Sequence, residues 1–187
     1  MRHAWAVGRG DTGTRTAMKA TTLLERQHRN LQQLCEAVER GSARMRESLL
    51  PQLAGDLVAH IAVEEQVFYP AASAALKEDG WVRSSRARHA QAMRLLDETL
   101  DAPVEGDAFA RVIGELRSAV EVHAEEEEEG LFPRLEDALD MKAMRQLALA
   151  MMSLYHAKVE AGYARHHDEP DVSGPDPPER DQHGMRP

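Results

Sequence analysis

The sequence lacks several features on which proteins commonly build a site. It has one cysteine, Cys35, which excludes an internal disulfide framework and a metal site made of thiolates and is consistent with a reducing compartment. No apolar run approaches the roughly eighteen residues of a membrane span. The net charge of −9 argues against nucleic acid or an anionic membrane as the main partner. Since the start of the chain also lacks the apolar stretch of a secretory signal, we expect a cytoplasmic protein.

The distribution of proline, glycine and apolar residues divides the chain into three parts. Residues 1–19 are rich in Gly, Thr and Arg, and residues 166–187 are polar and Pro-rich, so we expect both to be disordered ends. Between them, residues 20–165 form one expected domain, in which apolar residues recur every three or four positions, as in helices. The sequence therefore predicts an all-α fold, with helices over about 22–41, 51–69, 82–100, 107–132 and 141–165.

Capping residues and prolines set the expected ends of these helices. Thr22 and Glu25 form a capping-box pattern, and Pro51 would be tolerated in a first helical turn. Pro70 and Pro133 should stop or kink their helices, because a proline ring clashes with the carbonyl group four residues earlier.

An eleven-residue pattern occurs twice, as HIAVEEQVFYP in residues 60–70 and as HAEEEEEGLFP in residues 123–133. Both copies begin with His, have Glu four and five residues later, and end in an aromatic residue and Pro. His and Glu at positions i and i+4 lie on one face of a helix, close enough to bind one metal centre. The abundance of Glu would make one such pair weak evidence, but two matching copies are a specific signal.

One further histidine precedes each copy of the pattern. His28 lies 32 residues before His60, and His89 lies 34 residues before His123. All four histidines fall on the apolar stripes of their expected helices, as do the Glu residues four positions after His60 and His123. Bundle proteins build dinuclear iron or manganese sites from His and Glu contributed by four helices to a shared interior. The candidate metal ligands are His28, His60, Glu64, His89, His123 and Glu127.

Other interpretations of these residues need no metal. A lone His on an apolar stripe is more often a core residue that is hydrogen-bonded to a neighbour. Four such His and two such Glu without a metal would bury polar groups at a cost of several kcal/mol unless they paired with one another. A metal-free hydrogen-bonded network is therefore the less favoured alternative.

The acidic run from Glu125 to Glu129 should be mostly a solvated face, since only Glu127 falls on the buried stripe. Glu65 and Glu128 each follow a candidate ligand and are rotated from it by about 100°. We expect them at the surface or around the ligands.

Histidine and tyrosine residues elsewhere are expected to have other roles. Tyr155 or His156 approaches the site only if the last helix covers the mouth of the bundle, and a packing or surface role is favoured. His166 falls at the frayed end of that helix, and His3, His167 and His183 fall in the expected tails.

The chain resembles the hemerythrin-like, or HHE cation-binding, family over roughly residues 20–160. The resemblance rests on the order of His28, His60 with Glu64, His89, and His123 with Glu127. It implies an antiparallel up-down-up-down four-helix bundle, to which the last expected helix is an addition. It also implies two non-haem iron ions, joined by an oxo or hydroxo bridge, with both glutamates bridging and the four histidines shared between the ions.

Two departures separate the chain from oxygen-carrying hemerythrins. These resemble the chain but have a second His one turn after the histidine of the third helix, where this chain has Met93. They also have the fourth helix's carboxylate five residues after its His, which here would select Glu128 instead of Glu127. Two six-coordinate metals offer about twelve positions, of which the ligands and one bridging oxygen fill about ten. An open position on each iron favours redox chemistry or sensing over oxygen storage.

The ligand set is compatible with three functions. We expect a di-iron protein that binds O2, peroxide or NO, in defence against oxidative or nitrosative stress or in sensing these species. One alternative is an iron-responsive regulatory module whose folding state is read by a protein partner. The other is an enzyme that consumes peroxide, as catalases do.

Overall fold

The computed structural model describes residues 18–162, in which all regular structure is helical. The expected tails, apart from Met18 and Lys19, lie outside the described residues, as do His3, His166, His167 and His183. No helix in the described range is long and apolar enough to cross a membrane. The elements are α1 (Ala20–Arg40), α2 (Ala43–Val63), the π-helix η1 (Glu64–Phe68), α3 (Tyr69–Leu76), α4 (Gly80–Asp101), α5 (Asp107–Glu126), the π-helix η2 (Glu127–Leu131), α6 (Phe132–Ala138) and α7 (Met141–Ala161).

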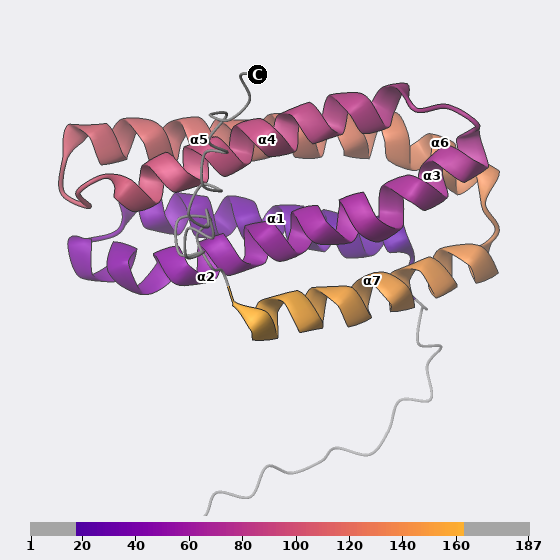
Figure 1. Ribbon diagram of the computed structural model, residues 1–187, viewed down its shortest axis with the longest axis horizontal. Coiled ribbons are helices and arrows are strands. Elements are labelled where there is room, and N and C mark those ends of the chain that lie inside the picture. Colours follow the sequence, from indigo (N-terminus) through magenta and orange to yellow (C-terminus); the bar gives the residue numbers. More distant parts are fainter. Residues whose placement is uncertain (1–17, 163–187) are drawn as a thin grey trace, which may run out of the picture.

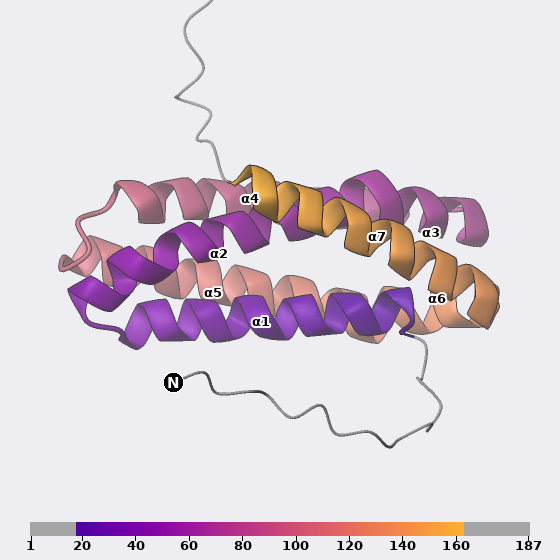
Figure 2. The ribbon, with the colours of Figure 1, turned by 90° about the horizontal axis from the view of Figure 1, so that it is seen from below.

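Four rods, each antiparallel to its neighbours, form a bundle (Figure 1). They are α1, the continuous rod α2–η1–α3, α4, and the continuous rod α5–η2–α6. Helix α1 packs against α2 and α5, and α4 packs against α5. Helix α7 lies along α2 and α1, outside the four rods (Figure 2). The expected all-α up-down-up-down bundle with a C-terminal helix is confirmed.

Two apolar cores fill the bundle and leave a polar layer between them. The first core includes residues after His28 in α1 and before His60 in α2, such as Leu31 and Leu57. The second includes residues before His28 and after His60, such as Leu24. Because neighbouring rods are antiparallel, one level of the bundle receives His28 and His60 together, and α4 and α5 contribute to the same level.

The two prolines of the repeat do not stop their helices, contrary to the expectation from sequence. A π-helical turn precedes each one, and the chain continues as α3 after Pro70 and as α6 after Pro133. The N–H of Tyr69 donates to the carbonyl of Glu64, five residues earlier, in place of the usual four-residue bond. This wider turn accommodates a following residue that has no N–H.

Two expected helix starts are also wrong. Helix α1 begins at Ala20, so Thr22 lies inside the helix and no side chain caps its end. Helix α2 begins at Ala43 and contains Pro51. Pro51 is exposed on the helix surface, where water can hydrogen-bond to the carbonyl group that the proline leaves free.

Candidate metal centre

All six candidate ligands lie in the polar layer between the two cores. Each is at most 6% exposed. Their helices bring them together from four rods: α1 carries His28, α4 carries His89, and each π-containing rod carries one His and one Glu. In each such pair the His lies in the last turn of an α-helix, and the Glu is the first residue of the π-helix that follows.

Glu64 lies at the middle of the four histidines. Its Oε1 is 3.5 Å from Nε2 of His28 and 3.3 Å from Nε2 of His60. Its Oε2 is 2.9 Å from Nε2 of His89 and 3.3 Å from Nε2 of His123. The rings within each of these pairs are also closest, with centroids 4.9 Å apart in the first and 4.8 Å in the second. Each oxygen of Glu64 therefore faces the two histidines of one sequence repeat.

Glu127 lies beside Glu64 and contacts one histidine of each pair. Its Oε2 is 3.8 Å from Nε2 of His28 and 3.9 Å from Nε2 of His123. Its other oxygen accepts a hydrogen bond from the hydroxyl of Tyr69. The two carboxylates thus span the same two groups of imidazoles.

Several buried atoms of this layer lack the hydrogen bonds that their burial requires. Ligand atoms of His28, His60, His123 and Glu64 all lie within 4.8 Å of one another. An unsatisfied buried polar group costs about 1–3 kcal/mol, and imidazole nitrogens and carboxylate oxygens are donors that suit iron, manganese and zinc. The residues therefore fit a bound cation. The unpartnered atoms are Nε2 of His28, His60 and His123, Nδ1 of His123, Oε1 of Glu64 and Oε2 of Glu127.

The two buried carboxyl groups of the layer ionise differently. Burial alone disfavours ionisation, but the imidazoles of His60 and His123 hold the pKa of Glu64 well below its usual value. Burial, together with the charge of Glu64, raises the pKa of Glu127 well above its usual value. Glu64 therefore ionises more readily than Glu127, and a bound cation would favour ionisation of both groups.

The second glutamate of each repeat lies outside the ligands and supports a histidine from the other repeat. Oε1 of Glu65 is 2.9 Å from Nδ1 of His89, and Oε1 of Glu128 is 2.9 Å from Nδ1 of His28. Burial lowers the pKa of both histidines, but hydrogen bonds to these carboxylates and to Glu64 raise it to about 9. From the sequence we expected these glutamates either at the surface or around the ligands. The structure places them around the ligands.

The other two histidines have weaker outer contacts. Nδ1 of His60 is 3.1 Å from Oε1 of Gln27, and Nδ1 of His123 has no partner among the described residues. Burial lowers the pKa of both imidazoles, and neither has a carboxylate at Nδ1.

Tyr69 belongs to the centre, although its chemistry was not anticipated from the sequence. Its hydroxyl lies 2.7 Å from Oε1 of Glu127, 3.1 Å from Oε2 of Glu64 and 3.2 Å from Nε2 of His89. A signal was available, because the second repeat has Phe132 at the same position. The hydroxyl is therefore a difference between two otherwise similar copies, and it is fully buried.

The structure does not bring Tyr155 and His156 to the centre. Helix α7 lies along the side of the bundle, and the two residues line a groove between α1 and α7 that also touches Gln27. Burial and the nearby Asp56 raise the pKa of the Tyr155 phenol. A packing or surface role, as favoured from sequence, agrees with this location.

Comparisons with known proteins agree with the geometry of the site. The family model described as hemerythrin HHE cation-binding domain matches residues 19–135, a range that contains all six candidate ligands and ends before α7. Among solved structures, a hemerythrin HHE cation-binding domain-containing protein from Mycobacterium kansasii shares the fold, with a TM-score of 0.68 and 22% identity over 77% of this chain and 89% of that chain. No curated protein sequence gives a significant match. The chain therefore belongs to the hemerythrin HHE cation-binding domain family.

Proposed function

We propose that this HHE domain holds two non-haem iron ions and binds O2, peroxide or NO, in defence against these species or in sensing them. The observation that carries the proposal is the position of Glu64, whose two oxygens divide the histidines into two pairs. A carboxylate in that position suits a bridge between two ions, each held by two imidazoles.

The ligand set follows from this division. His28 and His60 would hold one ion, and His89 and His123 the other. Glu127 contacts one histidine of each pair, which suits a second bridge. Iron in these positions would bind O2, peroxide or NO and exchange electrons with it. Helix α4 supplies no further imidazole, because the residue one turn after His89 is Met93, which packs against the first apolar core.

The surrounding residues would keep the site dry and its ligands fixed. The two apolar cores enclose the polar layer from both ends of the bundle. Glu65 and Glu128 accept hydrogen bonds from the Nδ1 atoms of two ligands and so direct the Nε2 atoms inward. The one cysteine, Cys35, is free and buried, which suits the reducing cytoplasm in which we expect the protein to act.

Consumption of peroxide is the second candidate function, and Tyr69 favours it. Its hydroxyl is hydrogen-bonded to Glu127 and lies near Glu64, so it has a proton to donate inside the buried polar layer. Breaking the O–O bond of peroxide requires protons for the departing oxygen. Release of O2 from added hydrogen peroxide, followed with an oxygen electrode, would distinguish an enzyme from a binding protein.

The experiment that tests the di-iron proposal is metal analysis of protein loaded anaerobically with ferrous iron. We expect about two irons per chain and, after oxidation, Mössbauer spectra of two spin-coupled ferric ions. Glu64→Ala should lose both ions, since it removes the group shared between them. Glu125→Ala is the matched control, because Glu125 is exposed and should retain the metal. One iron per chain, or zinc alone under iron-replete conditions, would contradict the proposal.

A further inference from the structure

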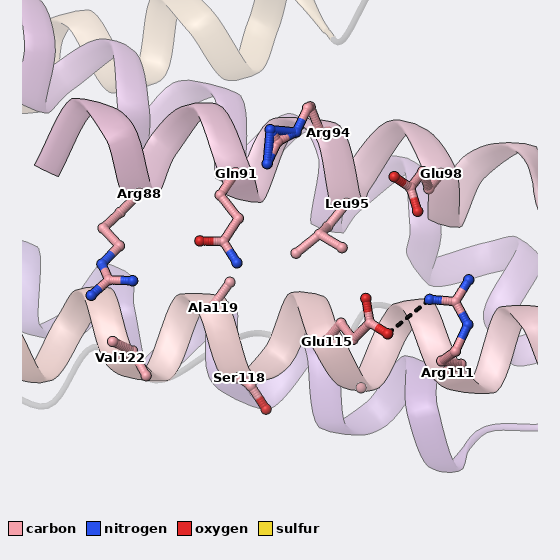
Figure 3. A pocket seen from close by; sticks show the side chains of 11 residues that line it. Arg88, Gln91, Arg94, Leu95, Glu98, Arg111, Glu115, Ser118, Ala119 and Val122 are labelled. Atoms are coloured by element: carbon pink, nitrogen blue, oxygen red, sulfur yellow. Dashed lines mark hydrogen bonds and ion pairs between the residues drawn. The ribbon is translucent and has the colours of Figure 1, made fainter. Parts of the chain in front are cut away.

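A surface groove runs between α4 and α5 on the side of the bundle away from α7 (Figure 3). Its volume is about 610 Å³. Gln91 and Leu95 of α4 point across it toward α5, and Ala119 of α5 points back (Figure 3). At one end the groove reaches the side chain of Arg88, the residue before the candidate ligand His89.

A much smaller cavity lies between this groove and the metal centre. It has a volume of about 10 Å³, close to the space that one water molecule needs. Three candidate ligands, His60, His89 and His123, form part of its wall. Arg88 and Ala119 line both the groove and the cavity, so these two side chains lie at the boundary between the two spaces.

We propose that small uncharged molecules reach the metal centre through this groove and cavity, and that Arg88 and Ala119 control their passage. The proposal rests on the proposed function for the identity of the ligand, and it adds the route and the residues that select by size. The ligand class is an uncharged molecule of about two heavy atoms, such as O2, NO or hydrogen peroxide.

The lining of the cavity supports this choice of ligand. Apart from Arg88 and the histidines, the wall consists of apolar side chains, Leu31, Leu57, Ala92, Ala119 and Val120. Apolar walls do not replace the water shell of a charged species. A space close to one water molecule also excludes alkyl hydroperoxides, which carry a bulky group on the O–O unit.

Arg88 has the position of a gate. Its guanidinium pairs with the carboxylate of Glu126 on α5, with Nε 3.2 Å from Oε2. Its Nη2 also donates to Oε1 of Glu126, so the pair is bidentate, and both side chains are 38% exposed. Opening the pair to admit a ligand would need a change of side-chain rotamer and no rearrangement of the helices.

The groove on the opposite side of the bundle does not offer an equivalent route. It lies between α1 and α7, and of the residues around the centre it touches only Gln27, which is bonded to His60. None of the six candidate ligands lines it. Of these two grooves, the one between α4 and α5 is continued by a space that candidate ligands line.

Ala119→Leu tests the route, because the larger side chain fills the passage between groove and cavity. Ser118→Leu is the matched control, since Ser118 lines the groove but not the cavity. In stopped-flow mixing of NO with the ferrous protein, we expect Ala119→Leu to slow association about tenfold, an added barrier of about 1.4 kcal/mol. Ser118→Leu should keep the wild-type rate, and Arg88→Ala should raise it. Iron content is measured for every variant.

A second measurement uses metal-free protein and needs no bound iron. Dissolved O2 is paramagnetic and speeds the NMR relaxation of methyl groups that it approaches. The methyl groups of Leu57 and Val120, which line the cavity, should relax faster than those of Ile113 and Leu116, which are also buried but line neither space. Ala119→Leu should remove this difference.

The outcomes separate the route from the di-iron proposal. Slower NO association and loss of the O2 effect in Ala119→Leu, with both retained in Ser118→Leu, support the route. Normal rates in Ala119→Leu and Arg88→Ala at full iron content overturn the route and leave the di-iron proposal standing. Protein without iron overturns the di-iron proposal, and the O2 measurement then decides the route. If Ala119→Leu does not fold, an unchanged rate of NO association in Arg88→Ala overturns the proposed route.

Discussion

The carboxylate of Glu65 lies 2.9 Å from Nδ1 of His89, and the same relationship joins Glu128 to His28. Each of these glutamates is the second of its HxxxEE pattern and reaches the lone histidine of the other repeat. The first glutamate of each pattern points into the centre. The pattern thus combines an inward carboxylate with an outward one that orients an imidazole across the bundle.

Glu65→Ala and Glu128→Ala should each weaken metal binding without removing a ligand. Loss of the acceptor at Nδ1 frees the histidine ring to rotate and lowers its basicity, and such losses typically cost about 10- to 100-fold in metal affinity. Competition with a chelator measures the change. Glu129→Ala is the control, since Glu129 is exposed, and an equal loss there would mean that the general acidity of the run is responsible.

His60→Ala and His123→Ala should each remove most of the metal and loosen the fold. Truncating a ligand leaves charged partners buried without compensation, and metal binding is coupled to folding in such sites. Metal content and thermal unfolding with and without added iron measure the two effects. Glu125→Ala, on the outer face of the same acidic run, should change neither. If Glu125→Ala lost metal as Glu127→Ala does, the assignment of Glu127 as the inward-facing glutamate of the acidic run would be wrong.

The bundle and the burial of the candidate ligands were predictable from periodicity. In an α-helix, the residue four positions after an inward His is also inward, so His60 predicted the burial of Glu64 and His123 that of Glu127. Both glutamates are fully buried. Only local spacing was needed, because the step from His to Glu is α-helical and each Glu is the first residue of its π-helix.

The directions of side chains that follow the start of the π-turn could not be predicted from the sequence. In a regular α-helix Tyr69, five residues after Glu64, would be rotated from it by about 140°. The π-turn instead bonds the Tyr69 N–H to the Glu64 carbonyl, which stacks the two side chains on one face. Pro70 indicated a disturbance of the helix, but a kink and a π-turn are both ways to accommodate a proline.

Gly130→Ala should destabilise the fold. Gly130 lies in η2, and a Cβ atom there would come 2.3 Å from Cη2 of Trp81. The ring must move, and overpacking of this kind costs about 1–3 kcal/mol. Gly55→Ala in α2 is the control, because nothing lies within 4 Å of its Cβ position, and alanine should stabilise that helix by about 0.5–1 kcal/mol. Denaturant unfolding measures both free energies, and a neutral Gly130→Ala would contradict this account of the packing.

Tyr69 and Phe132 occupy the same place in the two repeats. The Tyr69 ring stacks on His89 with centroids 5.7 Å apart, and the Phe132 ring stacks on His28 at 6.0 Å. The hydroxyl of Tyr69 therefore adds a proton donor to one half of a nearly symmetric centre. Burial and the neighbouring carboxylates raise its pKa, so the metal-free phenol keeps its proton.

Tyr69→Phe should make the two halves alike and separate proton donation from metal binding. The phenyl ring still stacks on His89, so we expect about the wild-type iron content. Consumption of hydrogen peroxide should fall by about a hundredfold, within the range attributed to general acids. Oxygen release and iron content are measured together, with Tyr155→Phe as the control because that phenol lies in the α1–α7 groove. Loss of iron in Tyr69→Phe would give the hydroxyl a role in holding the metal, whereas full peroxide consumption would exclude it as the proton donor.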